Sequence, residues 1–188
     1  NGEYCRVGLR VTLRGFGVGP SCVCAVVFVD AESFEVVSES LGHEVGDVVL
    51  WQLAGRLNSC RRSGDALARL VGDGFALVLN DSHGPTDAFY VVERLQEALA
   101  KVVEIQTHAV YTSASIGIAI SSENYKTSDE VIRDADIAMY RAKNSGHATY
   151  AVFDTSMHDQ AMFQHRTETD LRRALERGEF EVYYQPII

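Results

Sequence analysis

"RLVGDGFALVL", residues 69–79, places Asp73-Gly74 between two apolar runs. Two-residue turns of the primed types need positive φ at their central positions, which Asp-Gly adopts readily, so the stretch predicts a β-hairpin with strands near 66–71 and 75–80. A carboxylate at the tip of such a turn can also hold a metal ion, if a second carboxylate meets it from elsewhere in the fold. The hairpin therefore either only reverses the chain or forms half of a metal site.

The segments around this hairpin predict a sheet covered by helices. The β-branched run of residues 22–29 predicts a strand buried on both faces, with Asp30 at its carboxyl end. Further strands are expected at 109–120 and 148–154. Helical spacing or capping residues indicate helices at 34–57 (two helices or one bent helix), at 86–103, from the Thr127-x-x-Glu130 capping box to Gly146, and from 156 to Arg177. This order predicts an α+β sandwich with helices packed on a mostly antiparallel sheet, while residues 1–20 fit a strand or a helix end equally well.

Composition narrows the class of protein. With 188 residues, of which 46% are hydrophobic, the chain can bury the core of one domain, with or without an appendage. Its net charge of −9 argues against general binding to DNA or RNA, which needs a basic face. We see no membrane segment or signal peptide and expect a cytoplasmic protein. The four cysteines form no CxxC pair, so we expect reduced core thiols rather than a zinc site.

Four ordered segments resemble one family. They are "FVDAESFEVVSESLGHEVGDVVL" (28–50), "RLVGDGFALVL" (69–79), "ASIGIAI" (114–120) and "ADIAMYRAKNSG" (135–146), and they resemble the GGDEF, or diguanylate cyclase, domain. The resemblance implies a nucleotidyl-cyclase-like palm of the ferredoxin-like type over residues 1–155. "TDLRRALERGEFEVYYQPII" (169–188) looks like the start of an EAL phosphodiesterase domain, which implies a linker helix at 156–178 and a first EAL strand at 179–188.

The resemblance also implies a damaged catalytic site. Active members of the family join two GTP molecules into cyclic di-GMP with the help of Mg²⁺ held by carboxylates. Asp30 and Asp73 match the metal-binding positions, but Gly74 stands where the family has a catalytic glutamate, so no catalytic residue is assigned. Two further departures are Val71 in place of a glycine and Glu35 in place of a phosphate-contacting lysine. The residual nucleotide contacts would be Gly72, Ser38, Asp47 and Lys143, with Ser38 replacing an asparagine that reads guanine.

One further motif matches in register. Arg62-Ser63-Gly64-Asp65 lies where the family has an inhibitory RxxD site for cyclic di-GMP. A guanidinium can stack on guanine and donate two hydrogen bonds, and a carboxylate can accept from the guanine edge. Arg61 and Arg69 are expected to add positive charge near this motif. The alternative is an exposed salt bridge, a feature of many proteins.

These residues favour a catalytically inactive GGDEF domain that senses cyclic di-GMP or GTP and regulates a following EAL domain. A homodimer is a further expectation. Mg²⁺ would be needed only if GTP binds. Two alternatives stay open: a weakly active diguanylate cyclase that uses Asp30 and Asp73, and a dimerisation scaffold without a ligand. At single positions, Asp30 could instead cap the following helix, and Lys143 could lie in solvent.

Overall fold

The computed structural model describes residues 24–32, 34–70, 72–80, 85–105, 107–121 and 125–184. The predictions for residues 1–20, for Cys5, Cys22 and Val71, and for residues 185–188 lie outside these ranges. The chain forms two compact units, of which the first ends at Phe153 and the second begins at Asp154.

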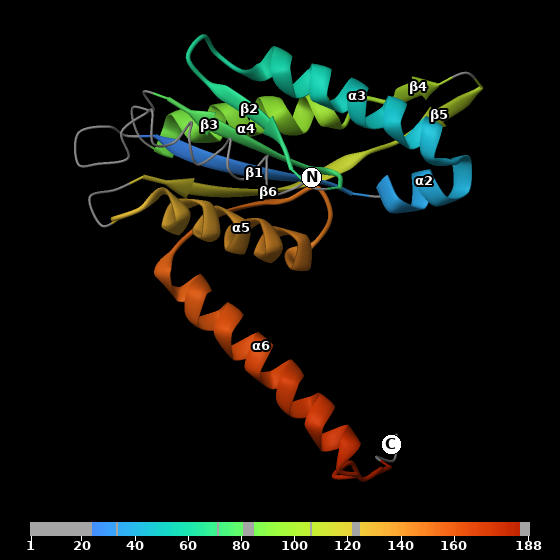
Figure 1. The fold of residues 1–188 in the computed structure, drawn as a ribbon, viewed down its shortest axis with the longest axis vertical. Coiled ribbons are helices and arrows are strands. Elements are labelled where there is room, and N and C mark those ends of the chain that lie inside the picture. The colour runs from blue at the N-terminus through green and yellow to red at the C-terminus, as the bar shows by residue number, and fades with distance from the viewer. Residues whose placement is uncertain are drawn as a thin grey trace, which may run out of the picture. The chain divides into compact units, whose positions relative to one another are not determined.

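The first unit is built on one five-stranded sheet with strand order β2-β3-β1-β6-β7 (Figure 1). The strands are β1 (Ala25–Glu32), β2 (Ala66–Arg69), β3 (Gly74–Leu79), β6 (Ser113–Ile120) and β7 (Tyr150–Val152). All neighbouring strands pair antiparallel except β6 and β7, which are parallel. The expected mostly antiparallel sheet is therefore confirmed. Its central strand, β1, is buried on both faces because helices cover both sides of the sheet.

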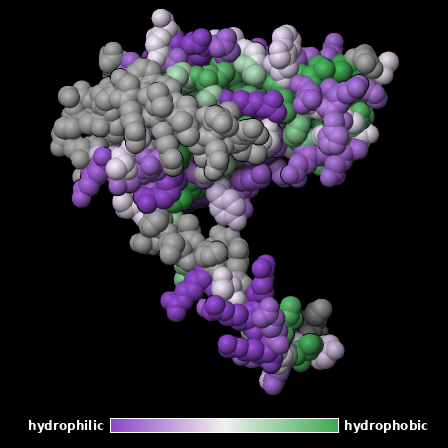
Figure 2. All heavy atoms as spheres, in the orientation of Figure 1, coloured by the Kyte–Doolittle hydropathy of each residue, from purple (hydrophilic) through white to green (hydrophobic). Residues whose placement is uncertain are grey.

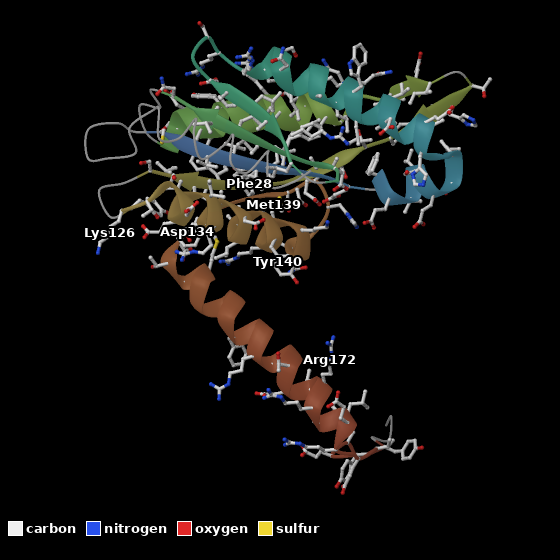
Figure 3. The ribbon with its side chains drawn as sticks, viewed as in Figure 1. Phe28, Lys126, Asp134, Met139, Tyr140 and Arg172 are labelled. Carbon is white, nitrogen blue, oxygen red and sulfur yellow. The ribbon has the colours of Figure 1, made fainter. Side chains whose placement is uncertain are left out.

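Helices α2 (Phe34–Leu41), α3 (His43–Cys60) and α4 (Pro85–Leu99) follow the strands of the first half of the unit, and α5 (Ser128–Ser145) follows β6. Figure 1 shows α3 and α4 on one side of the sheet and α5 on the other. The larger core packs Leu53 and Leu95 of these two helices against Val27 of β1. The smaller core packs Phe28 against α5, where Met139 points towards it (Figure 3). The result is the predicted α+β sandwich.

Gly117 lets α5 pack directly on β6. A Cβ atom added to Gly117 would lie 2.1 Å from the backbone nitrogen of Met139 and 2.2 Å from the carbonyl oxygen of Ala135. The backbone of the helix therefore touches the backbone of the strand at this point, and only glycine leaves enough room.

Several predicted boundaries are wrong. β1 continues two residues past Asp30 to Glu32, because Ala31 and Glu32 still pair with β6. The helix expected at 86–103 ends at Leu99, and the chain then forms a separate hairpin of β4 (Val103–Ile105) and β5 (His108–Val110). Arg56 of α3 explains this ending, because its guanidinium donates to the carbonyl oxygens of Ala98, Lys101 and Val102. The strand expected at 109–120 is accordingly divided into β5 and β6.

Two expected details of local geometry also differ. The positive φ of the β2–β3 turn belongs to Gly72 (φ +72°) rather than to Asp73 or Gly74, and Gly74 is already the first residue of β3. At the start of α5, Thr127 is the N-cap residue but makes no side-chain capping bond. In a capping box the carboxylate of Glu130 would accept from the backbone nitrogen of Thr127. It accepts instead from the backbone nitrogen of Lys126, one residue earlier, at 2.8 Å.

The second unit consists of α6 (Thr155–Glu176) and the residues that follow it. The side chain of Asp154 caps the helix by accepting from the backbone nitrogen of Ser156 at 2.7 Å, and Gly178 (φ +65°) follows the C-cap, as predicted. Leu171, Leu175 and Phe180 are exposed, and Figure 2 shows hydrophobic side chains gathered near this end of the helix. The described residues 179–184 form no strand, so the expected EAL strand stays a prediction. None of the described helices is long and apolar enough to cross a membrane.

Candidate functional site

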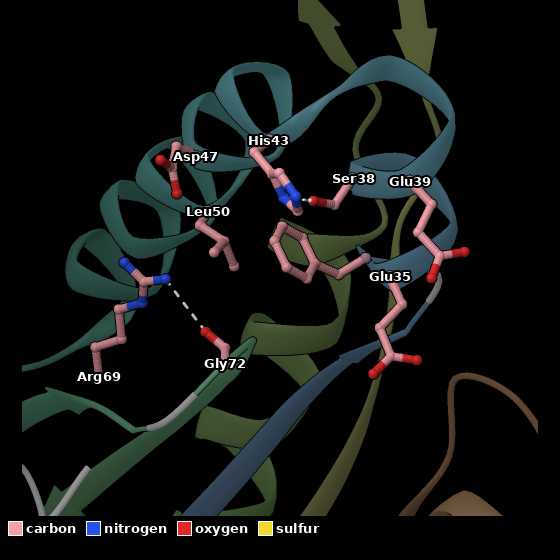
Figure 4. A pocket seen from close by; sticks show the side chains of 9 residues that line it. Glu35, Ser38, Glu39, His43, Asp47, Leu50, Arg69 and Gly72 are labelled. Carbon is pink, nitrogen blue, oxygen red and sulfur yellow. Dashed lines mark hydrogen bonds between the residues drawn. The ribbon is translucent and has the colours of Figure 1, made fainter. Parts of the chain in front are cut away.

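A pocket of about 460 Å³ opens where α2, α3 and the β2–β3 turn meet (Figure 4). The lining includes three of the predicted nucleotide-contacting residues, Ser38, Asp47 and Gly72. The full lining is Phe34, Glu35, Ser38, Glu39, His43, Asp47, Leu50, Arg69 and Gly72. A second pocket, of about 250 Å³, is lined by Glu32, Asp73, Lys143 and their neighbours. Glu35 and Phe34 line both pockets, so the two form one continuous site along α2.

The two predicted metal-binding carboxylates lie together. Asp30 is paired in register with Gly74, and the backbone nitrogen of Ala31 donates to the carbonyl oxygen of Asp73 at 3.4 Å, which holds the turn against β1. Burial raises the pKa of Asp73, and the nearby negative charge of Asp30 raises it further. Two oxygen-bearing side chains that repel one another fit a divalent cation such as Mg²⁺. Among the described residues, no group of three or more His, Cys, Asp or Glu side chains is arranged to hold a metal.

Lys143 faces the same carboxylates rather than solvent alone. Its Nζ donates to Oδ2 of Asp30 at 2.5 Å, and this bond raises the pKa of Lys143. The structure thus excludes the alternative in which Lys143 has no partner. Among the described residues, Asp30 makes a side-chain hydrogen bond to Lys143 and none to the first turn of α2. A cation that binds Asp30 has to share the carboxylate with Lys143 or displace it.

Position 74, where the resemblance implies a catalytic glutamate, holds a glycine. Gly74 is buried at the first position of β3, directly opposite Asp30 in the sheet. Glu35, on the first turn of α2, adds a negative charge where the resemblance implies a cation. Glu35 therefore opposes a triphosphate at this position, whereas a cation would attract it.

The residues expected to read guanine are only partly free to do so. Ser38 is buried, and its hydroxyl lies 2.9 Å from Nδ1 of His43 in a hydrogen bond (Figure 4). Asp47 is exposed and lines the pocket. An asparagine amide could donate and accept at once, whereas the Ser38 hydroxyl is already engaged by His43. Asp47 is therefore the better placed of the two for a guanine edge.

Arg69 lies at the pocket of α2 and α3 rather than at the RxxD motif. We expected its charge near the RxxD motif, but Arg69 ends β2 at the turn, lines the nucleotide pocket and donates from Nη2 to the carbonyl oxygen of Gly72 at 3.2 Å. The expectation was wrong because an extended strand separates Arg69 from Arg62 by about 3.3 Å per residue. Arg69 gives the pocket a second cation beside Lys143.

Glu32 and His147 were missed altogether. Glu32 is buried, and its carboxylate accepts from Ser113 at 2.6 Å and from Ser115 at 2.5 Å, while Nδ1 of His147 lies 3.0 Å away. Burial alone would raise the pKa of Glu32, but these three hydrogen bonds and the histidine charge lower it. The available signal was the period of two along a strand, which places Asp30 and Glu32 on one face.

The RxxD residues are adjacent, but they are not arranged as a free pair. The carboxylate of Asp65 is buried and accepts from the backbone nitrogen of Arg62 at 2.7 Å and from that of Asn80 at 3.1 Å. Arg62 is half-exposed, and its Nη1 lies 3.8 Å from Asp87 on α4. Asp65 therefore orders the turn between α3 and β2, and Arg62 is the member with a guanidinium available to a ligand.

Comparisons with known proteins agree with this geometry. The family model for "Diguanylate cyclase, GGDEF domain" matches residues 20–149. Over 86% of its length the chain is 39% identical to the bifunctional diguanylate cyclase/cyclic di-GMP phosphodiesterase MucR of Pseudomonas aeruginosa, and over 87% it is 36% identical to the cyclic di-GMP phosphodiesterase PdeR of Escherichia coli. In each case it spans 24% of the relative. The crystal structure of the GGDEF domain of TpbB from Pseudomonas aeruginosa superposes with a TM-score of 0.73 at 30% identity, covering 81% of this chain and 94% of that one.

Proposed function

This chain belongs to the diguanylate cyclase GGDEF domain family, and on that premise we propose that it is a regulatory domain that senses guanine nucleotide without making cyclic di-GMP. One observation carries the proposal. Gly74 faces Asp30 across the sheet, so the position that the family gives to a catalytic glutamate has no side chain. Loss of a general base or a metal carboxylate typically costs about 10²-fold to 10⁴-fold in rate.

The charges around the site support the same proposal. Bound Mg²⁺ would neutralise the negative charge that develops on the transferred phosphate, and Asp30 and Asp73 are the residues that would hold it. Glu35 lines the pocket next to this pair and repels a triphosphate. Lys143 and Arg69 attract phosphate, so GTP binding is expected to be weak rather than impossible.

We further propose that cyclic di-GMP is the preferred ligand and that it binds at the turn of Arg62 and Asp65. The support is the half-exposed Arg62 guanidinium, whose 3.8 Å contact with Asp87 is too loose to hold it strongly. The domain would pass the signal through α6 to an EAL phosphodiesterase domain in the same polypeptide. The resemblance of residues 169–188 to an EAL domain and relatives about four times longer than this chain support that partner. A homodimer is proposed because active members of the GGDEF family join two GTP molecules bound to facing domains.

Incubation of the chain with GTP and Mg²⁺ or Mn²⁺, followed by chromatography, tests the absence of cyclase activity. We expect no cyclic di-GMP. Gly74→Glu alone should not restore synthesis, because Val71 and Glu35 act on the same nucleotide, whereas the triple variant with Val71→Gly and Glu35→Lys is the matched positive control. Sustained product formation by the unaltered chain would instead establish the second candidate, a weak cyclase, which the proximity of Asp30 and Asp73 favours.

Residual GTP binding is tested separately by thermal shift. We expect little change in melting temperature with GTP and Mg²⁺. A clear rise that Asp30→Ala abolishes would show that the substrate site still binds nucleotide, and the expectation of weak or no GTP binding would then be wrong.

A further inference from the structure

A groove of about 590 Å³ lies along α3 from Trp51 to Asn58, next to strand β2. Four residues of α3 line one wall and four from the following turn and strand line the other: Trp51, Ala54, Gly55, Asn58, Arg61, Asp65, Ala66 and Leu67. β2 is an edge strand of the described sheet and pairs with β3 alone. It shares Asp65 with the RxxD turn and no residue with the nucleotide pocket.

Trp51 is a large aromatic residue of the groove whose side chain is mostly exposed. It is the only tryptophan in the chain, and 78% of it is exposed. Trp51 and Asn58 lie seven residues apart and thus on the same face of α3, with the small residues Ala54 and Gly55 between them. A Cβ added to Gly55 would meet nothing within 4 Å, so the floor beside the indole ring is open. A flat molecule can therefore reach the indole face.

Arg61 is held in place at the far end of this floor. Its Nε donates to Oδ1 of Asn58 at 2.6 Å, and its Nη1 donates to the carbonyl oxygen of Asp65 at 3.0 Å. Two bonds to a planar guanidinium fix its orientation before any ligand arrives, so little side-chain entropy is lost on binding.

The charge of the groove favours an anionic ligand. Asp65 is the only acidic residue among those that line it, and both of its carboxylate oxygens already accept backbone N–H groups. Arg61 and the neighbouring Arg62 supply two cations in a chain of net charge −9. An exposed indole beside a fixed guanidinium suits an aromatic base that carries a phosphate.

We propose that this groove, named here the Trp51 groove, is a base-stacking subsite in which guanine of a nucleotide lies on the indole ring of Trp51 while its phosphate contacts Arg61. The subsite extends the Arg62 and Asp65 site and rests on the proposed function for the identity of the ligand. Guanine could come from cyclic di-GMP or from GTP, and the two sources are separated in the test.

Because Trp51 is the sole tryptophan, its fluorescence reports directly on stacking at this position. Titration of the full chain with cyclic di-GMP should quench the emission, and GTP should quench it less at equal concentration. Isothermal calorimetry of Trp51→Ala should show affinity for cyclic di-GMP reduced roughly five- to a hundredfold, the range expected for one stacked base. Trp51→Phe should retain most of the affinity, and Arg61→Ala should lose it. Tyr90→Ala removes another exposed aromatic residue, on α4, and should leave binding unchanged.

The outcomes separate the two proposals. If cyclic di-GMP binds by calorimetry but neither quenches Trp51 nor binds Trp51→Ala more weakly, the subsite is wrong and the proposed function stands. If cyclic di-GMP does not bind the unaltered chain at all, both are wrong. Quenching by GTP alone would likewise overturn the assignment of the groove to the Arg62 site.

Discussion

Replacement of Asp65 by alanine is expected to destabilise the first unit strongly. The carboxylate is 6% exposed and accepts two backbone N–H groups, those of Arg62 and Asn80. Alanine removes both acceptors and leaves the two donors without them in a partly buried turn. A hydrogen bond to a charged group contributes about 1.5–3 kcal/mol, so the loss should be about 3 kcal/mol, a large part of the stability of an ordinary domain.

The measurement is urea unfolding combined with hydrogen exchange of the β1 amides, which report on the first unit and not on α6. For a domain of this size a loss of about 3 kcal/mol lowers the melting temperature by about 6–12 °C. Asp65→Asn should lose less, since one amide oxygen can still accept. Arg62→Ala is the matched control from the same motif: it removes only a half-exposed contact at 3.8 Å and should change stability by less than about 0.5 kcal/mol.

Equal urea midpoints for Asp65→Ala and Arg62→Ala would refute this reasoning. If the difference is found, loss of ligand binding in Asp65→Ala is not evidence for a contact between Asp65 and the ligand, because the turn itself is disrupted. Arg62→Ala and Arg61→Ala are then the variants that test binding.

Three further predictions concern stability. Gly117→Ala should cost about 3 kcal/mol or more in urea unfolding, or prevent folding, since the methyl group meets helix backbone, whereas Gly55→Ala in open space should stabilise α3 by up to about 1 kcal/mol. Arg56→Ala should lower stability by about 1–3 kcal/mol and speed hydrogen exchange at the end of α4; unchanged exchange there would contradict its role in ending the helix. The lowered pKa of Glu32 means that its stabilising effect is complete above pH 4.5 and is lost as the pH falls through the folded value, so Glu32→Gln should flatten the acid side of a stability curve measured between pH 3 and 7.

Local turn chemistry and periodicity predicted most of the sheet. The hairpin of β2 and β3 follows from a glycine-rich turn between apolar runs, and the strong apolar stretch of β1 could only be a central strand. The hairpin of β4 and β5 could not be predicted, because Val102 and Val103 continue the apolar spacing of the preceding helix. What ends that helix is Arg56, 42 residues earlier than Ala98, and such a contact leaves no local signal.

The sequence identified several residues of the candidate site, but it did not show which of them contact one another. The resemblance named Asp30, Asp73 and Lys143, yet the ion pair between Lys143 and Asp30 joins residues 113 positions apart and is visible only in the fold. The charge of Arg69 was expected near the RxxD motif, but β2 carries this residue to the pocket that Ser38 and Asp47 line. Glu32 was passed over because a buried carboxylate is recognisable only from the partners that satisfy it.

Some acidic residues of this domain are needed for the fold, and others would serve only chemistry. Glu32 and Asp65 are buried acceptors whose removal would leave hydroxyl or backbone donors unsatisfied, so the fold requires them whether or not a nucleotide binds. Position 74, where the resemblance implies a catalytic glutamate, holds a glycine, and β3 still pairs with β1 there because the pairing is made by the backbone. A motif match cannot separate a carboxylate that the fold requires from one that serves only chemistry, since the sequence shows the same residue type in both cases. The burial and the bonds of each carboxylate can, and for that reason Arg61, Arg62 and Trp51, which the fold leaves half-exposed or exposed, are the residues through which a ligand of this domain should be sought.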